Sequence, residues 1–367
     1  MASLLKDIYS PVFYNRLADS LAVSLPGFSK PVFLEAVLSK GFESMELKER
    51  MRHTTQALRR FMPGAFKGTA ALMKRLIDQL RRDGFRDQML EFMFLPDYIE
   101  TYGGDDYKES VKAFEYITQF ITCEFAVRPF IIRYPDAMMA QMLVWSQHKH
   151  DQVRRLSSEG CRPRLPWAMA LPALKKDPQP VLPILENLKN DPAEFVRRSV
   201  ANNLNDIAKD NPDTVIAIAA KWKGISRETD ALIKHGSRTL LKQGHSAILE
   251  HYGLSGLHAG LSGFTILTPA VKTGNKLHFT FSVNNKSKVA QTIRLEYAVY
   301  YRKQNGSLNR KVFKISERTY QAGETALIER RQSFEPITTR RYHPGLHRLA
   351  IILNGEEKEI LDFMLES

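Results

Sequence analysis

The chain has 367 residues, of which 43% are hydrophobic and 25% are charged, a composition that excludes gross disorder. This length is more than one compact core usually serves, so we expect two domains or a repeat array joined to a domain. A formal net charge of +13 favours a polyanionic partner.

The first third of the chain is predicted to be helical, because apolar residues recur at helical spacing from Pro11 onward. The Pro26-Gly27 pair divides residues 11–48 into two helices. Further helices are expected at Leu47–Met62, Lys67–Arg82, Phe85–Glu100 and, after a Gly103-Gly104 turn, Tyr107–Val127.

The next segment repeats one pattern three times. A proline is followed ten residues later by a large apolar residue, in the pairs Pro135/Trp145, Pro178/Leu188 and Pro212/Trp222. Val-Arg-Arg follows the first two pairs, at 153–155 and 196–198, and Leu232-Ile233-Lys234 follows the third. The proline intervals, 178 − 135 = 43 and 212 − 178 = 34 residues, are typical of paired-helix solenoids of the HEAT type. Such a solenoid lines a concave face with one helix of each pair.

After Gln243 the pattern changes from helical to strand periodicity. Glycines at 244, 253, 256, 260 and 263 predict a flexible hinge, and apolar residues then alternate with polar ones in 277–283 and 293–299. Further strands are expected at Lys311–Arg318, Thr325–Phe334, Leu346–Leu353 and Glu359–Leu365. About seven strands in this length predict an immunoglobulin-like β-sandwich.

The predicted fold is therefore mainly α, a HEAT-like helical-repeat solenoid followed by a C-terminal β-sandwich. The expected boundaries are residues 1–250 for the helical domain, 251–263 for a glycine-rich linker and 264–367 for the sandwich.

Arginines gather in the repeat segment, where a duplex could meet them with regularly spaced phosphates. We predict DNA contacts from a ridge of six arginines: Arg154, Arg155, Arg162, Arg164, Arg197 and Arg198. Trp145 and Trp222 occupy equivalent repeat positions and are predicted to be core residues. Trp167 follows two prolines on a basic turn, and it either stacks on a base or sugar or is buried in packing.

Carboxylates stand among these arginines, where they would repel phosphate. On the predicted helix, Glu124 projects near the apolar stripe of Ile117 and Ile121, which favours either a functional role or a buried salt bridge to Arg128 or Arg155. Glu159 lies at a helix C-terminus, where the dipole favours a cation. Asp206 shares a helix face with Asn202 and Asn203, a pattern that is also common on plain polar surfaces.

The sequence offers no site for a cofactor or a metal. His148 and His150 are two residues apart, on different sides of a helix, and no cysteine or aspartate cluster completes a metal site. Walker, dinucleotide-binding and G-x-S-x-G patterns are absent. The cysteines, Cys123 and Cys161, are too few for a disulfide framework, and no apolar run approaches the roughly 20 residues of a membrane span. We therefore expect a cytoplasmic protein without a membrane contact.

Two segments carry a resemblance to a known family. Glu159-Gly160-Cys161-Arg162-Pro163-Arg164-Leu165-Pro166-Trp167 and Ser199-Val200-Ala201-Asn202-Asn203-Leu204-Asn205-Asp206 resemble the AlkC branch of the AlkC/AlkD alkylpurine DNA glycosylases, including the subgroup with a C-terminal immunoglobulin-like domain. The resemblance implies excision of 3-methyladenine and 3-methylcytosine from double-stranded DNA, and we expect the protein to be a monomer. It also implies that the damaged base stays outside any deep pocket and that Glu124, Glu159 and Asp206 lie at the lesion.

The implied chemistry gives the carboxylates a purpose on a basic surface. Alkylation at N3 makes the base a cationic leaving group, and the sugar gains oxocarbenium character as the glycosidic bond lengthens. Carboxylates stabilise that charge and orient or deprotonate the attacking water, as in glycoside hydrolysis. The alternative is a non-catalytic helical-repeat scaffold that binds nucleic acid or an acidic protein, which would need the arginines and not the carboxylates.

Overall fold

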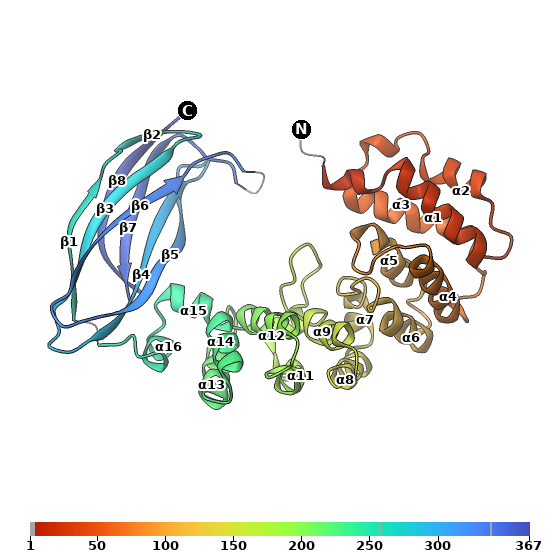
Figure 1. The fold of residues 1–367 in the computed structure, drawn as a ribbon, viewed down its shortest axis with the longest axis horizontal. Coiled ribbons are helices and arrows are strands. Elements are labelled where there is room, and N and C mark those ends of the chain that lie inside the picture. Colours follow the sequence, from red (N-terminus) through yellow and green to blue (C-terminus); the bar gives the residue numbers. More distant parts are fainter. Residues whose placement is uncertain (1–3, 257, 338–339) are drawn as a thin grey trace. The chain divides into compact units, whose positions relative to one another are not determined.

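The computed structural model describes residues 4–256, 258–337 and 340–367 and divides into two compact units, Met1–Gly236 and Ser237–Ser367 (Figure 1). The first unit is built from helices and the second mainly from strands, as predicted. In the described part of the chain, no helix combines the length and the apolarity that crossing a bilayer requires.

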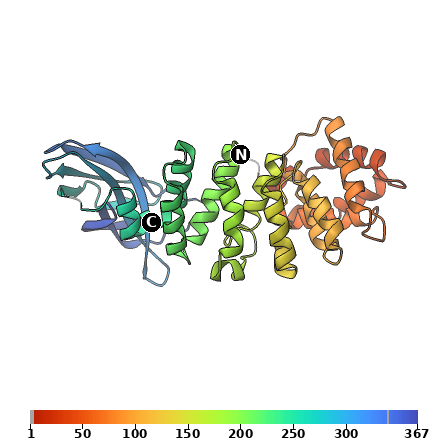
Figure 2. The ribbon, with the colours of Figure 1, turned by 90° about the horizontal axis from the view of Figure 1, so that it is seen from below.

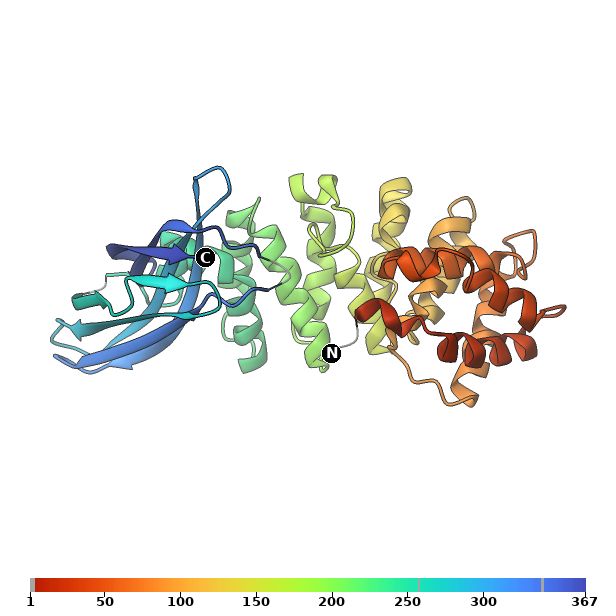
Figure 3. The ribbon, with the colours of Figure 1, turned by 90° about the horizontal axis from the view of Figure 1, so that it is seen from above.

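Amphipathic helices make up the first part of the helical unit, drawn in red and orange in Figure 3. They are α1 (Pro11–Ser24), α2 (Lys30–Val37), α3 (Leu47–Arg59), α4 (Thr69–Arg82), α5 (Phe94–Tyr102) and α6 (Tyr107–Ile117), with short 3-10 turns at Leu5–Ile8, Phe42–Ser44 and Leu90–Met93. Ser10 caps α1, because its hydroxyl accepts a hydrogen bond from the Phe13 amide at 3.2 Å. Apolar side chains such as Leu17, Phe33 and Leu58 face inward and are fully buried.

The helix predicted at Tyr107–Val127 is shorter than expected, because α6 ends at Ile117. Residues 118–127 form turns, in which the Phe120 carbonyl accepts a hydrogen bond from the Gln88 amide at 2.6 Å. A new helix, α7 (Arg128–Arg133), then starts with Pro129 in its first turn. Glu124 therefore lies on a turn, and the helical stripe assigned to it from the sequence is wrong.

Three helix pairs follow and lie side by side (Figure 2). They are α8 (Pro135–Trp145) with α9 (Asp151–Glu159), α11 (Leu182–Leu188) with α12 (Glu194–Ile207), and α13 (Pro212–Trp222) with α14 (Arg227–Gly236), and α12 packs between α9 and α14. Pro135 and Pro212 begin their helices as predicted, whereas Pro178 precedes a 3-10 turn at Gln179–Val181.

The repeated tryptophans are core residues, as predicted. Trp145 and Trp222 are buried, and each indole N–H donates to a glutamate, Glu115 at 2.8 Å and Glu186 at 2.9 Å. The same buried donor is thus satisfied in the same way in two repeats.

The second unit begins with α15 (Arg238–Gln243) and α16 (Ser246–His251) and continues as two β-sheets. Their strands pair antiparallel, except for one short parallel pair inside the larger sheet. One sheet has the order β1-β3-β6 and the other β2-β8-β7-β4-β5. The strands are β1 (Ala259–Ile266), β2 (Ala270–Lys272), β3 (Lys276–Asn285), β4 (Gln291–Arg302), β5 (Leu308–Tyr320), β6 (Thr325–Ser333), β7 (Gly345–Leu353) and β8 (Glu356–Glu366). Phe279, Phe281, Leu295 and Leu349 belong to the core between the sheets.

The chain divides into its two units after Gly236, so α15 and α16 belong to the second unit, and residues 259–263 of the expected linker lie in strand β1. The reason lies in the contacts of α15 and α16 with the β7–β8 turn. The Asn354 side chain donates to the Leu254 carbonyl at 2.9 Å, and a Cβ on Gly244 would lie 2.6 Å from the Gly355 carbonyl oxygen. These two helices therefore pack as part of the second unit.

Candidate functional site

Two of the predicted carboxylates meet at the ends of neighbouring helices. Glu159 is the last residue of α9 and Asp206 lies in the last turn of α12, and both are buried, with 5% and 2% of their surfaces exposed. Arg162 joins them, since its Nη1 lies 2.6 Å from Glu159 Oε1 and its Nε lies 2.9 Å from Asp206 Oδ2. This arginine also supplies the cation that the C-terminus of α9 favours.

The third carboxylate enters the same cluster through a second arginine. Glu124 Oε2 accepts hydrogen bonds from Arg155 Nη1 at 2.6 Å and from the Thr122 hydroxyl at 2.8 Å. Arg155 Nη2 also lies 3.9 Å from Glu159 Oε1. The salt bridge to Arg155 considered from the sequence is thus present, and Glu124, Glu159 and Asp206 form one ion-pair chain, here called the carboxylate cluster.

The pKa values of Arg162, in the cluster, and of Arg128, beside it, are shifted in opposite directions. Burial lowers the pKa of Arg162, but the charges of Glu159 and Asp206 outweigh burial and leave it raised. Arg128 is fully buried, and desolvation lowers its pKa to about 10. Both guanidiniums remain charged at neutral pH, so the carboxylates lie in a fixed cationic frame.

Arg128 fixes the segment that carries Arg162 and Trp167, residues 160–171, here called the Arg-Trp loop. Its Nη1 donates to the carbonyls of Gly160 and Arg162 at 2.9 and 2.8 Å, and its Nε donates to Met169 at 2.7 Å. Both ends of the loop are therefore tied to one buried side chain. The sequence offered Arg128 only as a salt-bridge partner for Glu124, because hydrogen bonds to carbonyls leave no signal in a sequence.

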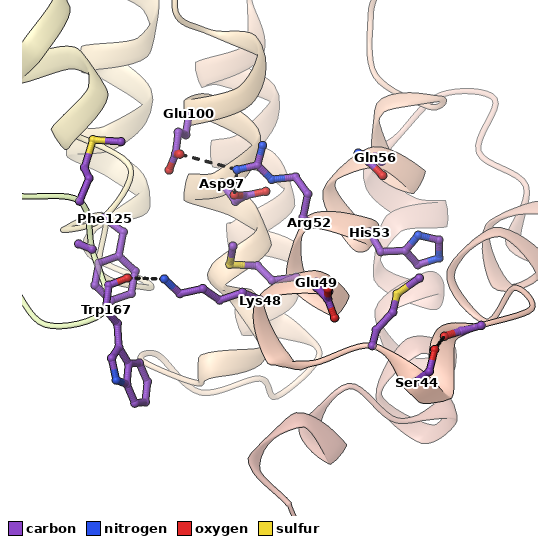
Figure 4. A pocket seen from close by; sticks show the side chains of 15 residues that line it. Ser44, Lys48, Glu49, Arg52, His53, Gln56, Asp97, Glu100, Phe125 and Trp167 are labelled. Carbon is purple, nitrogen blue, oxygen red and sulfur yellow. Dashed lines mark hydrogen bonds and ion pairs between the residues drawn. The ribbon is translucent and has the colours of Figure 1, made fainter. Parts of the chain in front are cut away.

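Trp167 projects from this loop into solvent, with 68% of its surface exposed. The buried-packing alternative is therefore wrong. Its φ of 65° is unusual for a residue with a side chain, and the Lys48 ammonium of α3 donates to its carbonyl (Figure 4). Lys48 also lies 5.3 Å from the centre of the Phe125 ring.

The six arginines of the predicted ridge divide into three groups. Arg155 and Arg162 belong to the carboxylate cluster, and Arg162 is buried, which removes it from an exposed ridge. Arg154 and Arg197 bind carbonyls of the turns that precede their own helices. Arg164 and Arg198 are the more exposed, paired with Asp210 and Glu194.

Two adjoining cavities open beside the cluster. The larger, about 800 Å³, lies between α3, α5 and the Arg-Trp loop (Figure 4). The smaller, about 310 Å³, reaches Glu124, Glu159 and Arg162, and both share Met51, Asp97, Glu100, Phe125 and Trp167 as lining residues.

Asp97 and Glu100 line both cavities, and neither was predicted as a candidate site residue from the sequence. They are three residues apart on α5, so they lie on one face of the helix, and this spacing could have been recognised in the sequence. Arg52 Nη2 of α3 lies 2.9 Å from Asp97 Oδ1 and 3.7 Å from Glu100 Oε1. Burial and the neighbouring Asp97 charge raise the pKa of Glu100 to about 7.

Comparison with known proteins gives a consistent picture. A family profile described as DNA alkylation repair enzyme matches residues 51–238, and one described as the C-terminal Ig-like domain of the uncharacterised protein YhaZ matches residues 260–367. The uncharacterised protein YhaZ of Bacillus subtilis is 40% identical over 362 residues, which cover 98% of this chain and 99% of that protein. The structure of Pseudomonas fluorescens alkylpurine DNA glycosylase AlkC, bound to DNA with an abasic site analog, matches over 100% of both chains with a TM-score of 0.92 and 31% identity.

Proposed function

The chain belongs to the DNA alkylation repair enzyme family, and we propose that this DNA repair glycosylase excises 3-methyladenine and 3-methylcytosine from double-stranded DNA. The observation that carries the proposal is the carboxylate cluster, three acids held by arginines in the basic helical unit. A plain phosphate-binding surface has no use for such acids. We expect the protein to act as a cytoplasmic monomer.

In the proposed reaction, the C1′–N bond breaks as a water oxygen bonds to C1′. The bond electrons leave with the alkylated base, which departs neutral because it was a cation before cleavage. Glu124, Glu159 and Asp206 stabilise the positive charge that develops on the sugar, and one of them takes the proton from water. No cofactor or metal is needed, since the alkyl group has already made the base a good leaving group.

The arginines take different roles in this proposal. Arg155 and Arg162 orient the acids, while Arg154 and Arg197 shape the turns before their helices. Arg164 and Arg198 lie at exposed ion pairs, which cost little to exchange for a phosphate contact. Trp167 is proposed to stack on the DNA at the lesion, because its ring is exposed on a basic loop.

The test is release of free base from methylated duplex DNA by the purified protein, with a chelator and without nucleotide. We expect free 3-methyladenine and 3-methylcytosine, with an abasic site left in the duplex. An Asp206→Asn preparation made in parallel controls for a contaminating glycosylase, since such a contaminant would excise equally in both. Absence of release from methylated DNA would contradict the proposal.

One observation favours a second candidate, a non-catalytic DNA-binding scaffold. Each of the three acids has an arginine partner, which is also what a purely structural ion-pair network would show. The two candidates differ in what neutralising an acid does. A structural network would lose thermal stability, whereas a catalytic cluster would lose excision rate with DNA binding retained.

A further inference from the structure

Asp206 binds a different cation on each of its two carboxylate oxygens. Arg162 Nε lies 2.9 Å from Oδ2, and Lys209 Nζ lies 3.1 Å from Oδ1. Lys209 follows the end of α12, on a turn in which its amide donates to the Asp206 carbonyl at 3.3 Å. The reaction proposed above uses Asp206 and Arg162 and gives no role to Lys209.

The two cations of Asp206 differ in how firmly they are held. The Arg162 side chain is 8% exposed and also binds Glu159 at 2.6 Å, so moving it would leave buried charges unpaired. The Lys209 side chain is 39% exposed, and a flexible, strongly hydrated ammonium leaves such an ion pair at little cost. Lys209 is therefore the cation that a ligand can displace.

The charges of the carboxylate cluster show what this displacement leaves behind. Its three acids are paired with two arginines, which leaves 3 − 2 = 1 negative charge for Lys209 to balance. Arg128 is also charged, but it directs its donors to the carbonyls of the Arg-Trp loop. A ligand with one positive charge therefore restores the balance when Lys209 moves away.

The place of Asp206 fits a ligand that stays at the surface. Asp206 is not among the residues that line either cavity beside the cluster. Its hydrogen bond with Arg162 is buried, whereas the one with Lys209 is only partly buried, so Oδ1 is the oxygen nearer to solvent. Moving the Lys209 side chain uncovers this oxygen without drawing the ligand into a cavity.

From these contacts we infer that Lys209 occupies, in the free protein, the place that the cationic sugar takes beside Asp206 Oδ1 during base excision. The inference rests on the proposed function. When a lesion docks, the positive charge that develops on the sugar replaces the ammonium, which then binds a phosphate of the DNA. Oδ1 is thus the oxygen that meets the developing charge, while Oδ2 stays bound to Arg162.

The exchange gives Lys209 a purpose during the search for damage. While the ammonium is in place, the cluster is neutral and does not repel the phosphates of undamaged DNA. A neutral sugar beside Oδ1 leaves the ion pair of Lys209 intact, whereas a cationic sugar has to compete with it. Lys209 therefore lowers the preference of the site for a cation, and its removal should raise that preference.

The experiment compares two duplexes that differ at one position. One carries a pyrrolidine there, a protonated cyclic amine in place of the cationic sugar, and the other carries neutral tetrahydrofuran. Fluorescence anisotropy with the full chain gives both dissociation constants, and their ratio is the preference for the cation. The protein should prefer the pyrrolidine duplex, and Lys209→Gln should raise the preference about threefold to fivefold, the effect of removing one exposed ion pair.

Three further variants make this result specific to the ion pair. Lys209→Arg keeps the competing charge and should keep the original preference. Lys176→Gln removes an exposed lysine of α10 (Pro172–Lys176) and should leave the ratio unchanged, because a lost phosphate contact weakens both duplexes alike. In a protein that already carries Asp206→Asn, Lys209→Gln should no longer change the preference.

An unchanged or reduced preference in Lys209→Gln would overturn the inference, as would equal binding of the two duplexes by the unaltered protein. Thermal unfolding checks that each variant is folded, and excision of methylated DNA is measured on the same preparations. Base release with an unchanged preference rejects the role of Lys209 and leaves the glycosylase proposal standing. A raised preference without base release rejects the glycosylase and retains the exchange at Asp206.

Discussion

The two Val-Arg-Arg segments of the helical unit have the same sequence, but only their first arginines make equivalent contacts. In Val153-Arg154-Arg155 and Val196-Arg197-Arg198, the first arginine binds the carbonyls six and five residues before it: His148 and Lys149 for Arg154, Asp191 and Pro192 for Arg197. The second arginines differ. Arg155 Nη1 lies 2.6 Å from Glu124 Oε2, whereas Arg198 is exposed and pairs with Glu194 of its own helix.

The difference shows that two repeats can keep the structural contact of the first arginine and differ in the contact of the second. The carbonyls that each first arginine binds are local to its own repeat, so copying the repeat copies the contact. The partner of the second arginine comes from outside the repeat: Glu124 lies on a turn 31 residues away from Arg155. The same motif can therefore join the carboxylate cluster in one repeat and form an exposed ion pair in the next.

The largest effect is expected from a test of whether the acids at the ends of α9 and α12 take part in catalysis. Asp206→Asn keeps the size of the side chain and removes its charge, so single-turnover excision should fall by a factor on the order of a hundred to a thousand. Binding to undamaged DNA should hold or tighten, because a negative charge near phosphate is gone. Asp210→Asn is the matched control, since Asp210 pairs with Arg164 one turn further on at the surface. Near-normal excision by Asp206→Asn would contradict the mechanism.

The same replacement in Glu124 and Glu159 separates their contributions. Glu124→Gln and Glu159→Gln should each slow excision, with a smaller loss for Glu124 because it joins the cluster through Arg155 and a hydroxyl on a turn. Single-turnover rates and thermal unfolding are measured together. A fall in melting temperature with an unchanged rate would assign that acid to structure.

The second arginines provide the sharpest comparison. Arg155→Gln removes the ion pair of Glu124 and should reduce the excision rate by about tenfold to a hundredfold, by analogy with residues that orient the ligands of a metal. Arg198→Gln should leave the rate alone and lower the salt slope of DNA binding by about one unit if it contacts phosphate. The comparison fails if both variants change the same quantity.

The first arginines should affect stability in both repeats. Arg197→Met removes the donor to one half-buried and one exposed carbonyl and should cost about 0.5–1.5 kcal/mol of unfolding free energy. Arg154→Met should cost more, because the buried Asp191 carboxylate also loses its bidentate partner. Denaturant unfolding measures both, and equal excision rates after correction for the folded fraction would confirm that these arginines are structural.

The smallest effect is expected in the second unit, whose basic residues we predict to contact DNA as a second clamp. Arg330 and Arg331 are exposed on β6, so Gln replacements should lower the salt slope by about one unit for each true phosphate contact. Lys replacements keep the charge and should keep the slope. An unchanged salt slope in the Gln variants would show that these arginines do not contact the DNA backbone.

The sequence predicted secondary structure correctly where a short segment alone determines it. Alternation in residues 277–283 gave β3, and the prolines at 135 and 212 gave the starts of α8 and α13. It failed at Glu124, because Ile117 and Ile121 continue the helical spacing past the point where the chain turns. A period can persist after the hydrogen bonds that define a helix have stopped.

The sequence predicted part of the candidate site and part of its pairing. Glu159 and Asp206 were taken from the resemblance and Trp167 from its place on a basic turn, and Arg155 was one of the two partners considered for Glu124; the structure joins Glu124, Glu159 and Asp206 in one cluster. Arg162 was taken as a phosphate ligand, but it is buried between Glu159 and Asp206, the latter 44 residues away. Net charge indicates that arginines are present; only packing decides whether one faces solvent or a carboxylate.

The uneven burial of the tryptophans gives the Arg-Trp loop an optical signature of its own. Trp145 and Trp222 are enclosed and hydrogen-bonded, while the Trp167 ring stands in water. An aqueous quencher of fluorescence can collide with Trp167 and is kept from the other two. The quenchable part of the emission therefore reports one residue of the site, so that docking of a duplex against the loop can be followed without attaching a dye.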